Sequence, residues 1–172
     1  ALNSILYQRG LYAPETFKRV ARYNLTLLVT TDPGLVAYLE QVMSQMEAWL
    51  LQGDVEKLVL VVTGTDSQQV LERWVFNVET EAAAGVNREN RDPDAVRAVK
   101  PEKEIMSEIQ AIIRQITASV TFLPVLDEPC SFDLLVYTKA DAAVPTEWED
   151  SDPKYISNST EVRLRSFTTK VH

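Results

Sequence analysis

The sequence predicts a single α+β domain in which a central three-stranded antiparallel sheet is backed by two long helices. Three stretches have the pattern of sheet strands. One is 57–63, around a continuous apolar run of β-branched character at 58–62, and the others have alternating apolar positions at 70–78 and 131–138. Apolar residues recur at three- and four-residue spacing in 33–52 and 102–119, as in helices that bury one face. The 172 residues are enough for one domain with a sizeable core.

The helix at 33–52 has both start and stop signals. Asp32 can accept hydrogen bonds from the free backbone N–H groups of the first turn, worth about 1 kcal/mol, and Pro33 suits the first helical position. Gly53 favours the left-handed backbone that ends helices. We expect its buried stripe to contain Leu35, Leu39, Val42, Met43, Met46, Trp49 and Leu50.

The second helix is expected to begin at Pro101–Glu102, with glutamates near its positive end. Its buried stripe is predicted to be Ile105, Ile109, Ile112, Ile113 and Ile116. Before the first helix, a turn at 10–16 should precede a half-buried strand at 23–30. The sequence further predicts a long polar loop at 80–100, an irregular acidic stretch at 139–159 and a strand-like run at 162–169, which pattern alone favours as a permanently docked last strand.

The amino-acid composition argues against several kinds of binding partner and cofactor. The net charge is −8, which argues against nucleic acid or an anionic membrane as the main partner, because phosphate neutralisation needs clustered Lys and Arg. No apolar run reaches the length of a membrane span. One Cys and one His, His172, give no set of metal ligands and no catalytic triad, so we expect no metal and no cofactor.

Candidate catalytic groups are few. The acidic clusters are Asp127–Glu128 and Glu147 with Glu149 and Asp150, and both are interpreted as solvated surface charge. Cys130 is interpreted as a small residue at a strand start, buried or half-buried. Phosphate-binding loops and nucleophile motifs are absent from the sequence. We therefore predict no catalytic residues, and a small hydrolase built on the acidic clusters is the enzyme alternative.

Seven blocks of sequence, taken in order, carry a resemblance to a known family: 3–10, 25–31, 70–74, 112–117, 120–124, 130–135 and 161–169. Together they closely resemble the mitotic-arrest-deficient, spindle-checkpoint branch of the HORMA domain family. The resemblance runs from the first residue to the last, and the main departure is the 80–100 loop, which looks longer than in the animal proteins.

The resemblance implies a HORMA domain over 1–172 that acts as an adaptor switching between open and closed conformers. Such adaptors hold a short extended peptide against a strand edge, and a mobile C-terminal safety belt, here 141–172, wraps over it. The implied peptide-binding residues are Ser131, Phe132, Asp133, Leu134, Leu135, Val136, Tyr137 and Trp148. A sister adaptor of the translesion DNA polymerase type is the alternative function, with the same fold and belt but another peptide.

The resemblance also implies a set of protein partners, and neither nucleic acid nor membrane. They are the co-activator of the anaphase-promoting complex, the coiled-coil checkpoint scaffold, a budding-uninhibited-type kinase-related protein, an AAA-type remodelling ATPase with its HORMA-like adaptor, and a second copy of the chain. Self-association would use Arg114, Gln115 and Phe122. The implied location is nucleus and cytoplasm, with kinetochores in mitosis.

The family's chain normally begins with a longer first helix and continues past His172 for one more strand. The belt closes when that strand pairs with the one resembling 162–171. A two-stranded hairpin that lacks one strand loses its ladder bonds. We therefore expect a protein that ends at His172 to hold its peptide much more weakly than an extended one.

Overall fold

The computed structural model describes residues 1–79, 100–139 and 160–163, the last four as backbone only. The helices and strands in these ranges are α1 (Leu2–Gln8), the 3-10 turn η1 (Pro14–Thr16), β1 (Phe17–Arg22), β2 (Leu25–Thr30), α2 (Pro33–Gln52), β3 (Val55–Gly64), β4 (Val70–Asn77), α3 (Glu102–Val120), β5 (Cys130–Thr138) and β6 (Thr160–Arg163). No described helix is long and apolar enough to cross a membrane.

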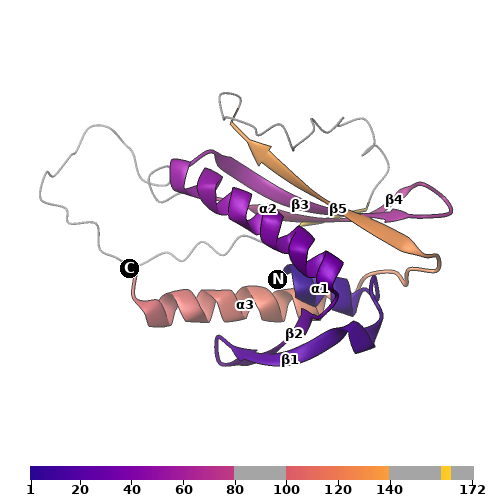
Figure 1. The fold of residues 1–172 in the computed structure, drawn as a ribbon, viewed down its shortest axis with the longest axis horizontal. Helices are drawn as coiled ribbons and strands as arrows, with labels where there is room; N and C mark the ends of the chain where they lie inside the picture. Colours follow the sequence, from indigo (N-terminus) through magenta and orange to yellow (C-terminus); the bar gives the residue numbers. More distant parts are fainter. Residues whose placement is uncertain (80–99, 140–159, 164–172) are drawn as a thin grey trace, which may run out of the picture.

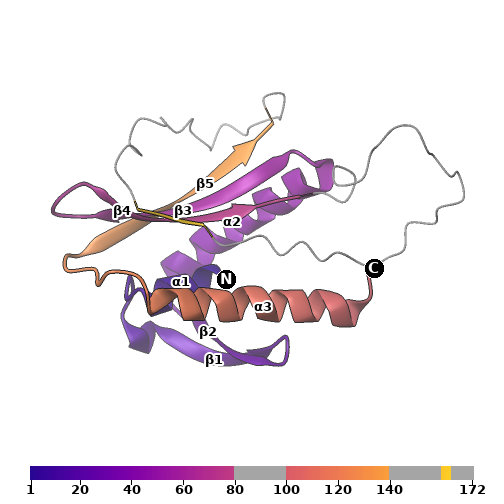
Figure 2. The same ribbon diagram turned by 180° about the vertical axis from the view of Figure 1, so that it is seen from behind.

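The elements form layers. In both views α1 and α3 lie between the larger sheet and the ribbon of β1 and β2, while α2 crosses one face of the larger sheet (Figures 1 and 2). Contacts of α1 with both α3 and β2 join these two helices to the ribbon of β1 and β2. The predicted arrangement of helices backing a sheet is therefore confirmed.

The larger sheet has the strand order β5-β3-β4-β6 in the described residues. β3 pairs antiparallel with β4 on one side and with β5 on the other, as the sequence predicts. The sheet also contains a fourth strand, β6, which runs parallel to β4. This strand overlaps the start of the run predicted at 162–169, and residues 164–169 lie outside the described ranges. The loop predicted at 80–100 also lies outside them, apart from Lys100.

The boundaries of α2 match the prediction. The Asp32 carboxylate accepts a hydrogen bond from the Leu35 N–H at 2.7 Å, and Gly53 ends the helix with a φ of 76°. Five of the seven predicted stripe residues are buried. Met43 and Leu50 are exposed, so that part of the prediction is wrong. They stand at the margins of the stripe, where a helix face turns away from the sheet.

The buried stripe of α3 is shorter than predicted. Ile113 and Ile116 are buried, but Ile105 and Ile112 are exposed, so the prediction is wrong for these two. Ile112 stands at the margin of the stripe, one residue before the buried Ile113. For Ile105, near the N-terminal end of α3, the reason is the length of α1. α1 has seven residues and α3 has nineteen, about 10 Å against about 28 Å, and α1 reaches α3 near its C-terminal end, where Gln8 donates to Thr117.

The first strand of the smaller sheet was not predicted. The sequence favoured one strand at 23–30, but β1 and β2 form a hairpin, and Tyr23 and Asn24 are its turn with positive φ values of 53° and 54°. β1 reads Phe-Lys-Arg-Val-Ala-Arg, and its burial follows a three-residue rhythm instead of strict alternation. β1 therefore lacks the alternating apolar pattern from which strands are predicted.

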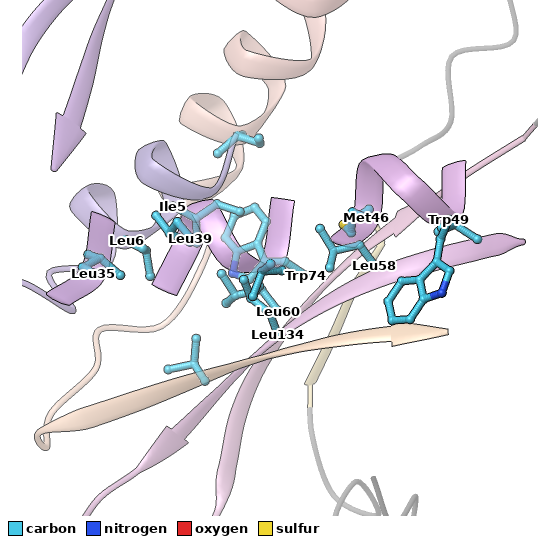
Figure 3. Packing of buried hydrophobic residues seen from close by; sticks show 14 residues of the cluster. Ile5, Leu6, Leu35, Leu39, Met46, Trp49, Leu58, Leu60, Trp74 and Leu134 are labelled. Atoms are coloured by element: carbon cyan, nitrogen blue, oxygen red, sulfur yellow. The ribbon is translucent and has the colours of Figure 1, made fainter. Parts of the chain in front are cut away.

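The core lies between the larger sheet and the helices. Figure 3 shows Trp74 and Leu60 of the sheet gathered with Ile5, Leu6 and Leu39 of the helices. All residues from Leu58 to Val62 are buried, which confirms β3 as a central strand covered on both faces. This central strand gives its two neighbours, β5 and β4, a rigid backing.

The connector between α3 and β5, residues 121–129, shows that the interpretation of Glu128 as solvated surface charge is incomplete. Glu128 is not simple solvated charge, because its carboxylate accepts hydrogen bonds from the backbone N–H groups of Asp66 and Ser67 in the β3–β4 turn. These bonds and one from the Ser67 hydroxyl lower the pKa of Glu128. Asp127 is exposed, as predicted, and the acidic cluster at 147–150 lies outside the described residues.

Candidate functional site

One edge of the larger sheet is open in the described ranges. β5 pairs with β3 along its whole length, and no other described strand lies beside it. In an antiparallel pair, successive residues turn their backbone N–H and C=O groups alternately toward the partner and away from it. Every second residue of β5 therefore offers a donor and an acceptor to an additional extended strand.

The predicted peptide-binding residues of β5 divide between the two faces of the sheet. Leu134 is buried, and Phe132 and Val136 pack against the core on the same face. The residues of the opposite face are exposed or half-buried: Ser131, Asp133, Leu135 and Tyr137. A strand added to this edge would carry side chains toward both faces in the same alternation.

Three aromatic rings stand together beside the first half of β5. Phe132 makes edge-to-face contacts with Tyr12 and Tyr38, with ring centroids 6.2 and 5.8 Å apart. Tyr38 comes from the second turn of α2, and Tyr12 comes from the segment after α1. A hollow of about 240 Å³ lies beside these rings and is lined by Tyr12, Gly34, Leu35, Tyr38, Phe132 and Asp133.

The two tyrosine hydroxyls of this hollow are neutral at physiological pH. Burial raises the pKa of Tyr38, a hydrogen bond from the Leu134 backbone opposes that rise, and the Asp133 carboxylate adds to it. Burial and the nearby Asp32 carboxylate raise the pKa of Tyr12. Both groups therefore act as neutral hydroxyls at the edge of the sheet.

Sequence reasoning did not find Tyr12 or Tyr38 as site residues. Tyr38 stands between two members of the apolar stripe of α2, so its spacing looks like core packing. Tyr12 follows a short helix and is far from β5 along the chain. Only the tertiary fold brings the two side chains to Phe132.

The opposite edge of the sheet is occupied. β6 lies beside β4, with Thr160 opposite Glu72 and Val162 opposite Trp74, on the side away from β5 (Figure 2). β6 belongs to the segment predicted as a safety belt. Trp148 and the other belt residues at 140–159 and 164–172 lie outside the described ranges.

A buried ion pair lies next to this occupied edge. Both Nε and Nη2 of Arg9, at the end of α1, donate to the Glu72 carboxylate, and the indole N–H of Trp74 donates to it at 3.2 Å. The same guanidinium donates to the Pro124 carbonyl of the connector after α3. The Arg9 and Glu72 side chains are 6% and 3% exposed, so the pair joins three segments inside the protein.

The predicted self-association residues lie at the end of α3 and just beyond it. Arg114 is exposed and donates to the Gln110 side chain at 3.3 Å, and Gln115 is half-buried. Phe122 is 88% exposed. Sequence reasoning missed Val125, three residues later, which is also a large exposed apolar residue at 86%.

A family model described as HORMA domain matches residues 1–172. The chain belongs to the HORMA domain family. This HORMA domain is 59% identical over 172 residues to the mitotic spindle assembly checkpoint protein MAD2A of Dictyostelium discoideum, covering all of this chain and 81% of the relative. It is 54% identical to MAD2A of Homo sapiens, covering 99% of this chain and 80% of that protein.

A solved structure of a checkpoint assembly is also similar to this chain. A chain in the crystal structure of a mitotic checkpoint complex matches with a TM-score of 0.80 and 43% identity, over 98% of this chain and 85% of that one. The translesion-type alternative is not favoured, because the full-length relatives of high identity carry spindle-checkpoint names. The HORMA fold and the spindle-checkpoint resemblance predicted from the sequence are both confirmed.

Proposed function

We propose that this HORMA domain is a spindle assembly checkpoint adaptor that captures a short extended peptide as an additional strand along β5. The observation that carries the proposal is the open β5 edge in a chain whose full-length relatives are named as checkpoint proteins. Main-chain hydrogen bonds would supply affinity, and the hollow beside Phe132 would select side chains. This role requires no catalytic residue.

The proposed ligands are segments of the anaphase-promoting complex co-activator and of the coiled-coil checkpoint scaffold. The match to a chain of a mitotic checkpoint complex supports checkpoint proteins as the class of partner. A budding-uninhibited-type protein and an AAA-type ATPase with its HORMA-like adaptor complete the proposed set. We place their encounters in nucleus and cytoplasm, and at kinetochores in mitosis.

In this proposal the two conformers differ in which edge of the larger sheet the belt occupies. β6, from the predicted belt, lies on β4 and leaves β5 open in the described residues. An open conformer would place the belt over β5 instead, so a ligand would bind only after the belt had moved. The differential binding of the peptide to the two conformers would then set their populations.

The proposal is tested with a backbone-methylated peptide series. A fluorescent peptide from the co-activator is titrated, and each of its amides is replaced in turn by an N-methyl amide. Strand addition predicts large losses of affinity at alternate positions, because only every second peptide N–H faces β5. Uniform tolerance along the peptide would contradict strand addition, and a scrambled peptide is the control for sequence.

Self-association is the second part of the proposed function. The exposed Phe122 and Val125, which follow α3 in the chain, and the exposed Arg114 near the C-terminal end of that helix support a contact with a second copy. Large exposed apolar side chains on a monomer often mark such contacts. We propose that this surface pairs copies in different conformers.

A further inference from the structure

The hairpin of β1 and β2 is positively charged, although the chain as a whole has a net charge of −8. Neither strand contains an acidic residue, and neither does the turn between them. The cations of β1 are Lys18, Arg19 and Arg22, and all three are exposed. In the described part of the chain none of them forms an ion pair or a side-chain hydrogen bond. Their charge is therefore available to a partner.

One edge of this hairpin is open in the described ranges. In both views β1 is the outermost strand, and β2 lies between it and α3 (Figures 1 and 2). The smaller sheet has only these two strands in the described residues, so β2 is the one described strand that pairs with β1. The far edge of β1 therefore has backbone groups that no described strand pairs.

Two observations show which backbone groups of β1 point outward. Just before the strand, the Thr16 carbonyl accepts a hydrogen bond from the Thr31 N–H at 2.6 Å, so Thr16 faces β2. At the other end, the two-residue turn has positive φ at both positions, the type in which the flanking residues, Arg22 and Leu25, bond to each other. Because direction alternates along a strand, the odd-numbered residues turn their N–H and C=O groups away from β2. These residues are Phe17, Arg19 and Ala21.

The cations flank this open edge on both faces of the hairpin. The Phe17 ring packs edge-to-face against Tyr7 of α1, with 5.2 Å between the centroids, so its face of the hairpin is the one toward the helices. Arg19 shares that face, whereas Lys18 and Arg22 lie on the opposite face, because side chains alternate along a strand. A strand added to this edge would have positive charges beside it on both faces.

We propose that the open edge of β1 is a docking site for an acidic extended segment of a partner protein, which pairs with β1 as an additional strand. Charged side chains on a sheet edge keep apolar and basic strands away. Carboxylates on the incoming strand are attracted to the same cations, because opposite charges across neighbouring strands stabilise the pair. A polypeptide fits better than nucleic acid or a membrane, because it alone matches the outward N–H and C=O groups. The proposal goes beyond peptide capture at β5 and does not depend on it.

The strand register predicts the spacing of the carboxylates. In an antiparallel partner, the residues opposite Arg22, Arg19 and Lys18 are the first, fourth and fifth of a five-residue run. In a parallel partner they are the first, second and fifth. Two short test peptides therefore carry glutamates at these two spacings among threonine and serine residues. A control peptide of the same composition carries its glutamates in an unbroken run, which can meet at most two of the cations.

The experiment titrates the full chain with each peptide at low salt and follows the backbone amides by NMR. A matched peptide should shift the amide signals of β1 and should bind more weakly as the salt concentration rises. Its affinity should fall about twofold to fivefold in Lys18→Gln and in Arg22→Gln, which each remove one surface ion pair. Lys103→Gln, on the exposed first turn of α3, is the control and should bind as the unchanged protein does.

Four results would overturn the proposal. They are no binding by either matched peptide, equal binding of the control peptide, amide shifts on β5 instead of β1, and unchanged affinity in both variants. A single-stranded oligonucleotide or anionic vesicles that shift the β1 amides more strongly than the peptides do would also overturn it, because the hairpin would then be a general anion surface. Thermal melting of the variants should match that of the unchanged protein, because the substituted side chains are exposed.

Discussion

The two edges of the larger sheet are built in opposite ways. At the β4 edge a parallel strand, β6, is already in place, and a buried carboxylate and guanidinium lie next to it. At the β5 edge no described strand is added, and neutral aromatic groups line a hollow beside it. The first edge is tied to α1 and to the connector by charge-assisted hydrogen bonds. At the second edge, no described strand covers the outward backbone groups of β5.

The largest effect is expected at the ion pair next to β4. Glu72→Gln leaves the buried Arg9 guanidinium without a counter-charge, which costs about 3 kcal/mol when one partner of a buried pair is removed. Urea denaturation followed by circular dichroism measures the loss. Glu56→Gln, at an exposed position of β3, is the control and should change stability by less than about 0.5 kcal/mol. Equal effects of the two variants would mean that the ion pair does not anchor this edge.

A smaller, pH-dependent effect is expected where the connector meets the β3–β4 turn. Hydrogen bonds from Ser67 and Asp66 lower the pKa of Glu128 in the folded protein. A carboxylate with a lowered pKa stabilises the fold above its unfolded pKa, and this stabilisation disappears as the pH falls through the folded value. The difference in unfolding free energy between the unchanged protein and Glu128→Gln should therefore shrink as the pH falls from 7 to 3.

Gly64→Ala checks the same contact independently. A Cβ at Gly64 would lie 2.4 Å from Glu128 Cδ, so the carboxylate must move and lose its hydrogen bonds. The Gly64→Ala variant should lose the same part of the pH dependence as Glu128→Gln. A difference that is constant with pH would contradict the role given to Glu128.

Local signals predicted the elements that depend on neighbours in sequence. Asp32, Pro33 and Gly53 gave the ends of α2 because caps act within one helical turn. The apolar run of β3 predicted a central strand of the sheet, because this signal also lies within the strand's own residues. The resemblance added the functional strand, β5, which pattern alone identified only as a third core strand.

Contacts between distant segments could not be predicted in this way. Arg9 and Glu72 come from different elements, and each has an ordinary local sequence. The same holds for Tyr12 and Tyr38, which come from different segments and both contact Phe132. The exposure of Ile105 depends on the length of α1, a property of another helix. Tertiary packing decides all of these.

The smallest effect on stability is expected at the surface of α3. Arg114 is exposed, so Arg114→Glu should leave the melting temperature nearly unchanged. If this surface pairs two copies, the variant should lose its dimers in light scattering. Lys103→Glu, on the exposed first turn of the same helix, makes the same charge change away from Phe122 and should keep its dimers. An unaltered dimer fraction in Arg114→Glu would reject the assignment.

Residue-resolved hydrogen exchange with and without a bound co-activator peptide tests the central claim, that β5 receives the ligand as a strand. The account predicts that the peptide slows exchange of the outward N–H groups of Phe132, Leu134 and Val136. Exchange at Asp133 and Leu135 should change little. Their N–H groups face β3, in alternation from Lys139, whose N–H donates to the Asp54 carbonyl just before β3. Protection that appears on β4 instead, or on all β5 amides alike, would contradict strand addition at the open edge.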